Sequence, residues 1–498
     1  MPPLSIFSIS DLPDHLMLLL AAILVFFAIM STKLGARFGV PSLLLFLILG
    51  MVAGADILGF RFDNYGMAES IGHFAMTIIL FTGGLSTSME EIKPVWRQGL
   101  LLSTLGVLIT TILTGCFIYF VMGRLLGLLG MTILGSILLA AIMSSTDSAS
   151  VFSILKGKGM NLRHNLSPML ELESGSNDPI AYILTILLVD IIQAKANTDL
   201  STWGLVGNAA LTFLLQFVIG IAIGIAVGYA AVWIIKTIKL PNSALYSILL
   251  LSFAFLANGL AAVCLGNGLI ALYLAAIIIG NKAPSRLKRE VLKFFDGMTW
   301  LMQLMMFLML GLLARPSQMP VIAPQAIIIA LFMIFLARPL SVLACLAPFR
   351  KLPIKAKSFI SWVGLKGAGP ILFALCPVVA GLHGADDIFN IVFFIALMSL
   401  LIQGMTLTPL ARKLDLCFDD DPKVETFGME LPEEMGMLRD HTVSEDDLAC
   451  GGTLRDMRLP HGIRVIMVKR EDRFLVPHGS MPLQVGDILI VMMGESDD

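Results

Sequence analysis

Thirteen apolar stretches of helical length can be read in the first 413 residues, and two of them could be re-entrant instead of crossing the membrane. The hydrocarbon core of a bilayer takes a helix of about 20 residues, and only helices and closed barrels satisfy their own main-chain groups there. Charged residues make up 14% of the chain, well below the roughly 25% of a soluble domain. The sequence therefore predicts an all-α polytopic membrane protein with about 13 transmembrane helices. The expected spans are residues 14–32, 40–59, 67–87, 98–121, 131–154, 167–192, 204–235, 244–265, 267–281, 296–314, 321–348, 358–382 and 387–410.

Acidic residues concentrate after residue 413. Residues 414–498 hold 19 of the 36 acidic residues but only 8 of the 34 basic ones. This part therefore carries a net charge of −11, whereas residues 1–413 carry +9. A polar, acidic segment after a long apolar one indicates an exposed domain attached to a membrane domain. We expect a transmembrane domain over 1–413, a linker over 414–426 and a small cytoplasmic α/β domain over 427–498.

Basic residues are distributed unevenly between alternate loops. One set of alternate loops holds twenty Lys and Arg residues, whereas the other set holds only Arg61, Arg124, Lys195 and Arg315. Because Lys and Arg accumulate in cytoplasmic loops, the N-terminus is predicted to lie outside and the C-terminus in the cytoplasm. No basic residue precedes the first span, so we expect it to be an anchor rather than a cleaved signal peptide.

Five charged side chains fall near the middle of predicted spans. They are Asp147, Glu173, Asp178, Arg338 and Lys366. A charge at the centre of a bilayer costs from about 3 to more than 10 kcal/mol, so such residues usually serve a function or an ion pair. For Arg338, which precedes a proline, we expect only a helix kink and a buried charge partner that the sequence does not identify.

The segment 171–179 places oxygen atoms along one face of a helix. Glu173 and Asn177 are four residues apart, as are Ser174 and Asp178, so the four side chains share a polar stripe. Oxygen ligands at this density suit a hard monovalent cation, or a proton that competes for the same carboxylate. A polar seam between helices is the alternative, although such seams rarely hold two carboxylates at one depth.

Two of the predicted spans contain segments that disfavour a continuous helix. Residues 144–150 combine five hydroxyl side chains with Asp147, and residues 364–370 read Gly-Leu-Lys-Gly-Ala-Gly-Pro. Hydroxyl side chains compete for main-chain hydrogen bonds, which favours unwinding near Thr146 and Asp147. Two broken helices in opposite halves of the chain are typical of an inverted-repeat transporter with a central site, where two unwound helices cross.

Glu173 and Lys366 are the opposite charges that we expect to pair at this depth. We predict a structural Glu173–Lys366 ion pair that steadies the broken helices and leaves Asp178 free to titrate. A carboxylate in a low-dielectric site can bind a proton or a cation, but not both. Either occupant neutralises the site and lets it change sides, whereas the empty anion resists crossing. This chemistry predicts obligatory exchange.

Three motifs occur in the order Thr146-Asp147, then Glu173-Ser174-x-x-Asn177-Asp178, then Gly364-Leu365-Lys366-Gly367-Ala368. Together they resemble the sodium/proton exchanger superfamily. The Asn-Asp pair is similar to the NhaP-type branch of monovalent cation:proton antiporters. The resemblance implies a homodimer in a bacterial inner membrane, with thirteen helices in each protomer and a core that moves like an elevator.

The resemblance also implies roles for single residues. Asp178 would be the carboxylate that binds the ion and the proton. Ser174, Asn177 and the Thr146 backbone would help to hold a monovalent cation, with Asp147 close by. Exchange would be electroneutral, one cation for one proton. The family usually has Arg where this chain has Lys366, and Lys keeps the ion pair but loses the bidentate fork.

The tail contains Gly-Thr-Leu-Arg-Asp-Met-Arg-Leu-Pro at 452–460, an alternating run at 463–468 and Gly-Asp-Ile-Leu-Ile-Val at 486–491. This pattern resembles the C-terminal subdomain of RCK/TrkA regulatory modules, which are small α/β units on potassium channels and transporters. No glycine-rich dinucleotide fingerprint precedes it, so only the non-Rossmann half is expected. The tail thus implies an unknown cytoplasmic ligand, and the whole chain resembles potassium/proton exchangers of the NhaP branch.

Exchange of K⁺ for H⁺ is the leading hypothesis, with Na⁺ as the second candidate cation. The alternatives are an RCK-regulated K⁺ channel, a Na⁺-selective proton antiporter and an ion-coupled symporter. A K⁺ channel would need a filter of backbone carbonyls, and the sequence contains no TVGYG-like segment. Scattered His and Cys residues predict no enzyme, zinc site or cofactor, and a net charge of −2 argues against a nucleic-acid partner.

Overall fold

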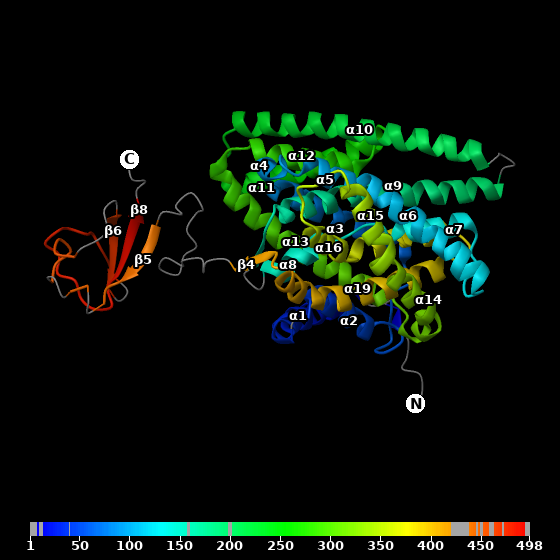
Figure 1. Cartoon of the computed structure of the whole chain (residues 1–498), viewed down its shortest axis with the longest axis horizontal. Helices are drawn as coiled ribbons and strands as arrows, with labels where there is room; N and C mark the ends of the chain where they lie inside the picture. The colour runs from blue at the N-terminus through cyan, green and yellow to red at the C-terminus, as the bar shows by residue number, and fades with distance from the viewer. Residues whose placement is uncertain are drawn as a thin grey trace. The chain divides into compact units, whose positions relative to one another are not determined.

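A computed structural model gives the structure of the chain and describes residues 7–8, 13–38, 40–156, 160–197, 202–419, 438–444, 447–448, 452–457, 463–470 and 473–493. The chain divides into two compact units, residues 1–418 and 419–498. The first unit is almost entirely helical, and the second contains a small β-sheet (Figure 1).

The first half of unit 1 contains α1 to α9. The helices are α1 (Asp14–Phe38), α2 (Ser42–Ala53), α3 (Tyr65–Ser86), α4 (Met89–Ile92), α5 (Trp96–Leu101), α6 (Val107–Cys116), α7 (Ile133–Ile142), α8 (Ser148–Lys156) and α9 (Leu166–Asn197). Two π-helical segments, η2 (Leu102–Gly106) and η3 (Phe117–Leu125), flank α6. Short strands β1 (Phe7–Ser8) and β2 (Phe60–Arg61) pair in parallel, and β3 (Met160–Leu162) pairs with β4 (Cys417–Asp419).

The second half of unit 1 contains α10 to α19. The helices are α10 (Thr202–Thr237), α11 (Ser243–Val263), α12 (Gly268–Lys282), α13 (Ser285–Leu313), α14 (Met319–Phe332), α15 (Arg338–Leu346), α16 (Ile354–Trp362), α17 (Ala368–Phe373), α18 (Leu375–Val379) and α19 (Ala385–Lys413). A 3₁₀ turn, η4 (Pro316–Gln318), precedes α14, and a π-helical turn, η5 (Met333–Ala337), separates α14 from α15.

Nine helices or continuous helical runs of the described residues are long and apolar enough to cross a membrane. Four shorter apolar helices accompany them: Ser42–Ala53, Ile133–Ile142, Gly268–Lys282 and Ala368–Val379. A helix rises 1.5 Å per residue, so helices of 10–17 residues fall short of the roughly 30 Å hydrocarbon core. The chain is a multi-pass membrane protein, whereas the count of thirteen spans stays a prediction.

Helix α12 lies at the centre of one group of helices. It packs against α3, α10 and α11, and most of its side chains are buried. A helix that is apolar all round must be surrounded by protein or lipid, which fits this position. Its neighbour α10 runs along the upper edge of the helices in Figure 1. It exposes large hydrophobic side chains, among them Leu211, Leu214 and Val218, as expected for a helix that faces lipid.

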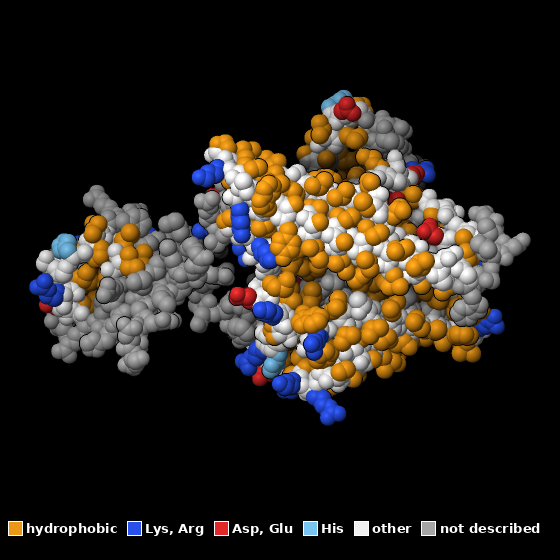
Figure 2. All heavy atoms as spheres, turned by 90° about the horizontal axis from the view of Figure 1, so that it is seen from above, with side chains coloured by type: hydrophobic (Ala, Val, Ile, Leu, Met, Phe, Trp, Pro, Cys, Tyr) orange, Lys and Arg blue, Asp and Glu red, His pale blue; other side chains and the backbone are white. Residues whose placement is uncertain are grey.

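The surface of unit 1 combines a hydrophobic face with a basic end. Figure 2 shows hydrophobic side chains over most of the visible face, with Lys and Arg gathered toward one end of it. Lys236, Lys239 and Lys282 are exposed where α10 and α12 end. All three belong to the loops that were predicted to face the cytoplasm.

One close helix contact depends on glycine. Gly50 of α2 and Gly311 of α13 face each other, and a Cβ on either residue would collide with the main chain of the opposite helix. Because neither residue has a side chain, the two backbones approach directly and bury the apolar faces of both helices.

Unit 2 contains a four-stranded antiparallel sheet of order β5-β8-β6-β7. The strands are β5 (Leu438–Thr442), β6 (Ile463–Arg470), β7 (Arg473–Leu475) and β8 (Ile488–Met493). The sheet expected from the tail sequence is therefore present. Between residues 438 and 493, the described segments contain no helix, and residues 458–460 of the predicted motif lie outside the described residues.

A buried ion pair ties β6 to the turn that precedes β8. The carboxylate of Asp487 accepts hydrogen bonds from Nε of Arg470 at 2.8 Å and from Nη2 at 2.6 Å. The Asp487 residue is only 2% exposed. The Arg470 guanidinium, helped by the backbone N–H of Gln484, holds the pKa of the Asp487 carboxyl below its usual range despite burial. The stability that this pair contributes is therefore present above the unfolded pKa of about 3.9 and is lost as the pH falls through the folded pKa.

Replacing Asp487 by Asn should lower the free energy of unfolding of unit 2 by about 1.5–3 kcal/mol at neutral pH, because the charge-assisted hydrogen bonds are weakened. Hydrogen exchange of β6 and β8 in the full-length chain, corrected for intrinsic rates, measures this loss. The wild-type protein should lose the same protection below about pH 4, whereas Asp487→Asn should show little acid dependence. Asp456→Asn, which removes an exposed carboxylate of the same unit, is the control. Equal protection in wild type and Asp487→Asn would contradict the assignment.

Candidate ion-binding site

Two non-helical segments lie side by side inside unit 1. Helix α7 ends at Ile142 and α8 begins at Ser148, while α16 ends at Trp362 and α17 begins at Ala368. The backbone N–H of Asp147 donates to the Leu365 carbonyl at 2.9 Å, so the two segments are joined by a main-chain hydrogen bond. The interruptions lie where the hydroxyl-rich and glycine-rich segments indicated them. That the two helices cross as in an inverted repeat stays a prediction.

The first segment is fixed to α9 by side chains of the polar stripe. The hydroxyl of Ser174 donates to the Thr146 carbonyl at 2.8 Å and accepts from the Ser148 N–H at 3.0 Å. The amide of Asn177 donates to the Thr146 hydroxyl at 2.6 Å. Ser174, Asn177 and Thr146 are all buried. The three-residue spacing of Ser174 and Asn177 thus lets one face of α9 satisfy polar groups of the broken segment and of the start of α8.

The two aspartates have different surroundings. The Asp147 carboxylate accepts hydrogen bonds from the Ser150 N–H at 3.1 Å and from its hydroxyl at 2.5 Å, so it caps the start of α8. Asp178 accepts one hydrogen bond, from the hydroxyl of Ser145. No other described residue is hydrogen-bonded to the Asp178 side chain. Asp178 is therefore the carboxylate with more unused acceptor capacity.

Both aspartates line a pocket that encloses about 460 Å³ of empty space, part of it open to the surroundings. Its other lining residues come from α3, α8, α13, α17 and the broken segment, and are Met76, Ile79, Ser145, Ala149, Gln303, Met306, Phe307, Ala368, Gly369 and Pro370. Within the described parts of the chain, no group of three or more His, Cys, Asp or Glu residues could hold a metal ion. One or two carboxylates with hydroxyl and carbonyl oxygens suit a singly charged cation better than a multivalent one.

Lys366 satisfies carbonyl groups rather than a carboxylate. Its ammonium donates to the Ser145 carbonyl at 2.9 Å and lies 3.5 Å from the Ser144 carbonyl. Its backbone N–H donates to the Ser399 hydroxyl at 2.9 Å. These carbonyls belong to the non-helical segment between α7 and α8, where no helix supplies a hydrogen-bond partner. Lys366 is buried in this position and connects the second broken segment to the first.

The predicted pairing of Glu173 with Lys366 is wrong: the structure pairs Glu173 with Arg338. The guanidinium of Arg338 contacts the Glu173 carboxylate, and the two side chains are only 8% and 1% exposed. Arg338 begins α15 directly after the π-helical turn η5, and its side chain passes beside Gly364, where a Cβ would lie 3.1 Å from Nε. The charge partner that the sequence could not assign to Arg338 is therefore Glu173.

The structure brings all five predicted ion-binding residues into one cluster: Ser174, Asn177, Thr146, Asp147 and Asp178. It also adds Ser145, which the sequence placed in the hydroxyl-rich segment without a role of its own. The position of Ser145 immediately before Thr146 was the one sequence signal that could have indicated a place for it in the site. Which of these groups contacts an ion stays a prediction.

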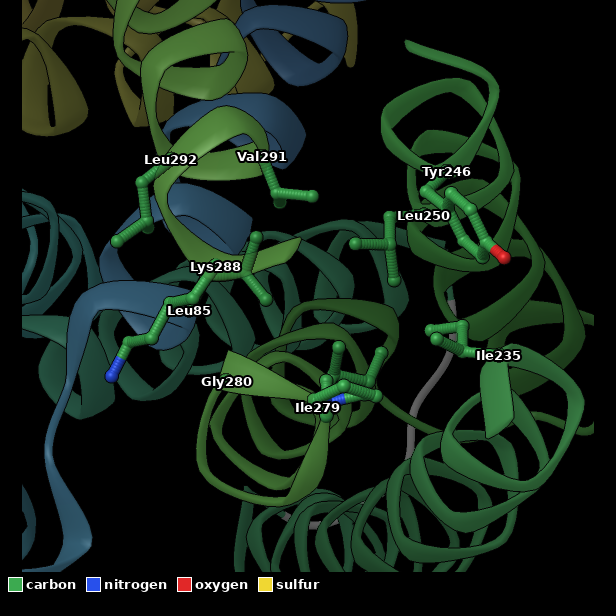
Figure 3. Close-up of a pocket in the computed structure, with 11 residues that line it drawn as sticks. Leu85, Ile235, Tyr246, Leu250, Ile279, Gly280, Lys288, Val291 and Leu292 are labelled. Carbon is green, nitrogen blue, oxygen red and sulfur yellow. The ribbon is translucent and has the colours of Figure 1, made fainter. Parts of the chain in front are cut away.

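A second pocket, of about 400 Å³, is lined mainly by hydrophobic side chains. Figure 3 shows Leu85, Leu250 and Ile279 around it, together with Tyr246 and Lys288. Among the described residues that line this pocket there is no carboxylate, and Lys288 would repel a cation. Of these two pockets, the one that contains Asp178 is therefore the better candidate for a cation site.

Two family descriptions match the chain. "Sodium/hydrogen exchanger, transmembrane" matches residues 20–413, and "TrkA-C domain" matches residues 438–497. The K(+)/H(+) antiporter NhaP2 of Shewanella baltica is 38% identical over 477 residues, which cover 95% of this chain and 80% of that protein. The K(+)/H(+) antiporter NhaP of Alkalimonas amylolytica is 36% identical over 501 residues, which cover 97% of this chain and 82% of that protein.

More distant relatives show the fold. The sodium proton antiporter MjNhaP1 from Methanocaldococcus jannaschii, solved at pH 8, superposes with a TM-score of 0.65 at 20% identity. The superposition covers 79% of this chain and 97% of that structure. The Na(+)/H(+) antiporter NhaG of Bacillus atrophaeus is 31% identical over 298 residues, 58% of this chain and 54% of that protein.

The partner of Glu173 can be tested by double-mutant cycles on the melting temperature in detergent. Glu173→Gln should destabilise the protein by about 3–5 kcal/mol, because Arg338 stays buried without a counter-charge. Adding Arg338→Met should recover part of this loss, with a coupling of about 0.5–3 kcal/mol.

The same cycle with Lys366→Met is the control, since Lys366 bonds to carbonyls. Its effect should add to that of Glu173→Gln within about 0.5 kcal/mol. Coupling to Lys366 instead of Arg338 would restore the pairing that the sequence indicated.

Proposed function

The chain belongs to the sodium/hydrogen exchanger family, and on this basis we propose that it is an antiporter that exchanges K⁺ for H⁺ by alternating access. Na⁺ is the second candidate cation. The relatives named K(+)/H(+) antiporters match at least 95% of the chain, whereas the relative named as a Na(+)/H(+) antiporter matches 58% of it. Coverage by the potassium-exchanging relatives favours K⁺.

The observation that carries the mechanism is the contrast between the buried carboxylates. Glu173 is neutralised by Arg338, and Asp147 caps α8. Asp178 faces the pocket with a hydroxyl partner and no salt bridge among the described residues. An unpaired carboxylate in this position is unfavourable, so a proton or a cation is expected to neutralise it. The two occupants compete for the same oxygen atoms.

Competition at Asp178 gives coupled exchange. In the proposed cycle, Asp178 takes a cation on one side, changes sides, releases the cation and returns with a proton. In this proposal, Ser174, Asn177, the Thr146 carbonyl and Asp147 remain further ligands of the cation. Of these four groups, Asp147 lines the pocket, whereas the other three are hydrogen-bonded around the broken segment. One carboxylate that alternates between one cation and one proton makes the exchange electroneutral, because each crossing carries the same net charge.

The location and assembly are part of the same proposal. The bacterial relatives support a bacterial inner membrane, and the exposed lysines at the ends of α10 and α12 support a cytoplasmic position for that end. The N-terminus then lies outside, and the C-terminal unit is cytoplasmic. We also propose a homodimer, and a regulatory role for the TrkA-C domain through a cytoplasmic ligand.

A regulated K⁺ channel is the second candidate, because the TrkA-C domain resembles modules found on channels. The sequence contains no TVGYG-like filter segment. A channel also has no need for a carboxylate that must be neutralised before each crossing. Coupling to protons separates the two functions.

Asp178→Asn should reduce cation-dependent proton flux to the background leak while the melting temperature stays near that of the wild type. The amide stays neutral near neutral pH and does not titrate between a charged and an uncharged form, so it cannot alternate between the two occupants. Asp190→Asn is the matched control, because Asp190 is exposed near the end of the same helix. Exchange that survives in Asp178→Asn would move the site, and Asp147 would be tested next.

The function itself is tested by the collapse of an imposed pH gradient in proteoliposomes that contain K⁺, Na⁺ or neither. Proton flux should depend on the cation and be greater with K⁺. Clamping the membrane potential with valinomycin in parallel K⁺ samples should leave the rate unchanged if the exchange is electroneutral. Cation flux without proton movement would favour the channel.

A further inference from the structure

Four polar side chains lie next to the pocket of Asp178 but do not line it. Tyr182 follows Asp178 by four residues on α9, so it stands one turn further along that helix. His73 and Glu69 precede the pocket residue Met76 on α3, and Cys376 comes from α18. Helix α18 packs against both α3 and α9, which brings the four residues together.

The cluster is held by direct contacts between helices. The Tyr182 hydroxyl and Nε2 of His73 are hydrogen-bonded at 3.1 Å, and the two rings meet edge to face with centroids 4.9 Å apart. Glu69 stands four residues before His73 on the same face of α3, and α3 packs against α18, which carries Cys376. The cluster therefore connects α3 to α9 and to α18.

Apolar side chains pack around this polar cluster. The Tyr182 ring packs against Phe373, with ring centroids 5.6 Å apart, and Phe373 is fully buried. Leu372 packs directly on Gly72 of α3, where an added Cβ would collide with it. These contacts between α3, α9, α17 and α18 form what we call the seal. It has a tightly packed apolar part at Gly72 and a polar part at His73.

The pocket ends at this seal. Its described lining residues reach Met76 on α3, Asp178 on α9 and Pro370 on α17, and none of them lies beyond these three toward His73, Tyr182 and Phe373. The next turns of these three helices carry His73, Tyr182 and Phe373. The pocket is therefore closed in the direction of the start of α3 and the end of α9.

We propose that His73 and Tyr182 form a gate that must open when the pocket of Asp178 connects to that side of the membrane. The proposal rests on the alternating-access function above. Asp178 and Tyr182 are carried by the same helix, so a movement of α9 relative to α3 that exposes Asp178 also separates Tyr182 from His73. Once the gate is open, the Glu69 carboxylate and the Cys376 thiol supply polar groups along the passage.

Cys376 is a native reporter of the gate, because it lies three residues after Phe373 and is only 8% exposed while the gate is closed. The test is its rate of modification by N-ethylmaleimide in the full-length protein in detergent, followed by mass spectrometry of the modified peptide. Tyr182→Phe and His73→Phe both remove the hydrogen bond and keep an aromatic ring. Each should raise the rate of modification several-fold.

Two controls separate gating from unfolding. Tyr246→Phe removes a buried hydroxyl that donates to the Ile238 carbonyl, away from the gate, and should leave the rate at Cys376 unchanged. Cys345 is buried elsewhere in unit 1 and should stay protected in every variant. Unchanged modification of Cys376 in both gate variants, or equal increases at Cys345 and Cys376, would overturn the gate.

The liposome experiment separates this proposal from the function on which it rests. Cation-dependent proton flux in the wild type, with no change at Cys376 in the gate variants, would leave the antiporter standing without this gate. Absence of coupled flux in the wild type would overturn the exchange mechanism, whatever the labelling shows.

Discussion

Main-chain groups that leave a helix inside a membrane must find other partners, and the centre of this protein is organised by that requirement. The segments 143–147 and 363–367 both lie outside the helices. Some of their main-chain groups find partners in the other segment: the Asp147 N–H donates to the Leu365 carbonyl. Side chains from α9 and the ammonium of Lys366 supply the remaining contacts described above. Because lipid cannot replace these partners, the two segments and α9 form one connected unit.

This requirement distributes the polar residues between structural and chemical roles. Ser174, Asn177 and Lys366 are committed to the broken main chain, and Asp147 to the start of α8. Glu173 and Arg338 neutralise each other away from the pocket. Asp178 is left with a hydroxyl partner and an open pocket, which is the arrangement that reversible binding of a small cation needs. The candidate site is thus defined as much by what its neighbours are bonded to as by the carboxylate itself.

Features that depend on local spacing could be predicted from the sequence. The long apolar spans, both helix interruptions and the polar stripe on α9 follow from composition and from the helical repeat, and the structure has them. Contacts between distant segments could not be predicted in the same way. Lys366 and Arg338 were both buried cations at a suitable depth, and only the packing of α15 beside Gly364 decides which one reaches Glu173. His73 and Tyr182 lie 109 residues apart, so their contact has no signature in either local segment. The lengths of single helices could not be predicted either, because hydropathy does not show that an apolar run contains only a short helix.

The hydrogen bond between residues 147 and 365 has a consequence for how such a chain can change. It uses an amide and a carbonyl that every amino acid provides, except for the amide that proline lacks at position 147. Substitution of either side chain therefore leaves the junction of the two segments intact. This one junction is therefore independent of the side chains at positions 147 and 365, so mutation there can vary the surroundings of Asp178, and with them ion preference, without breaking the bond that joins the two segments.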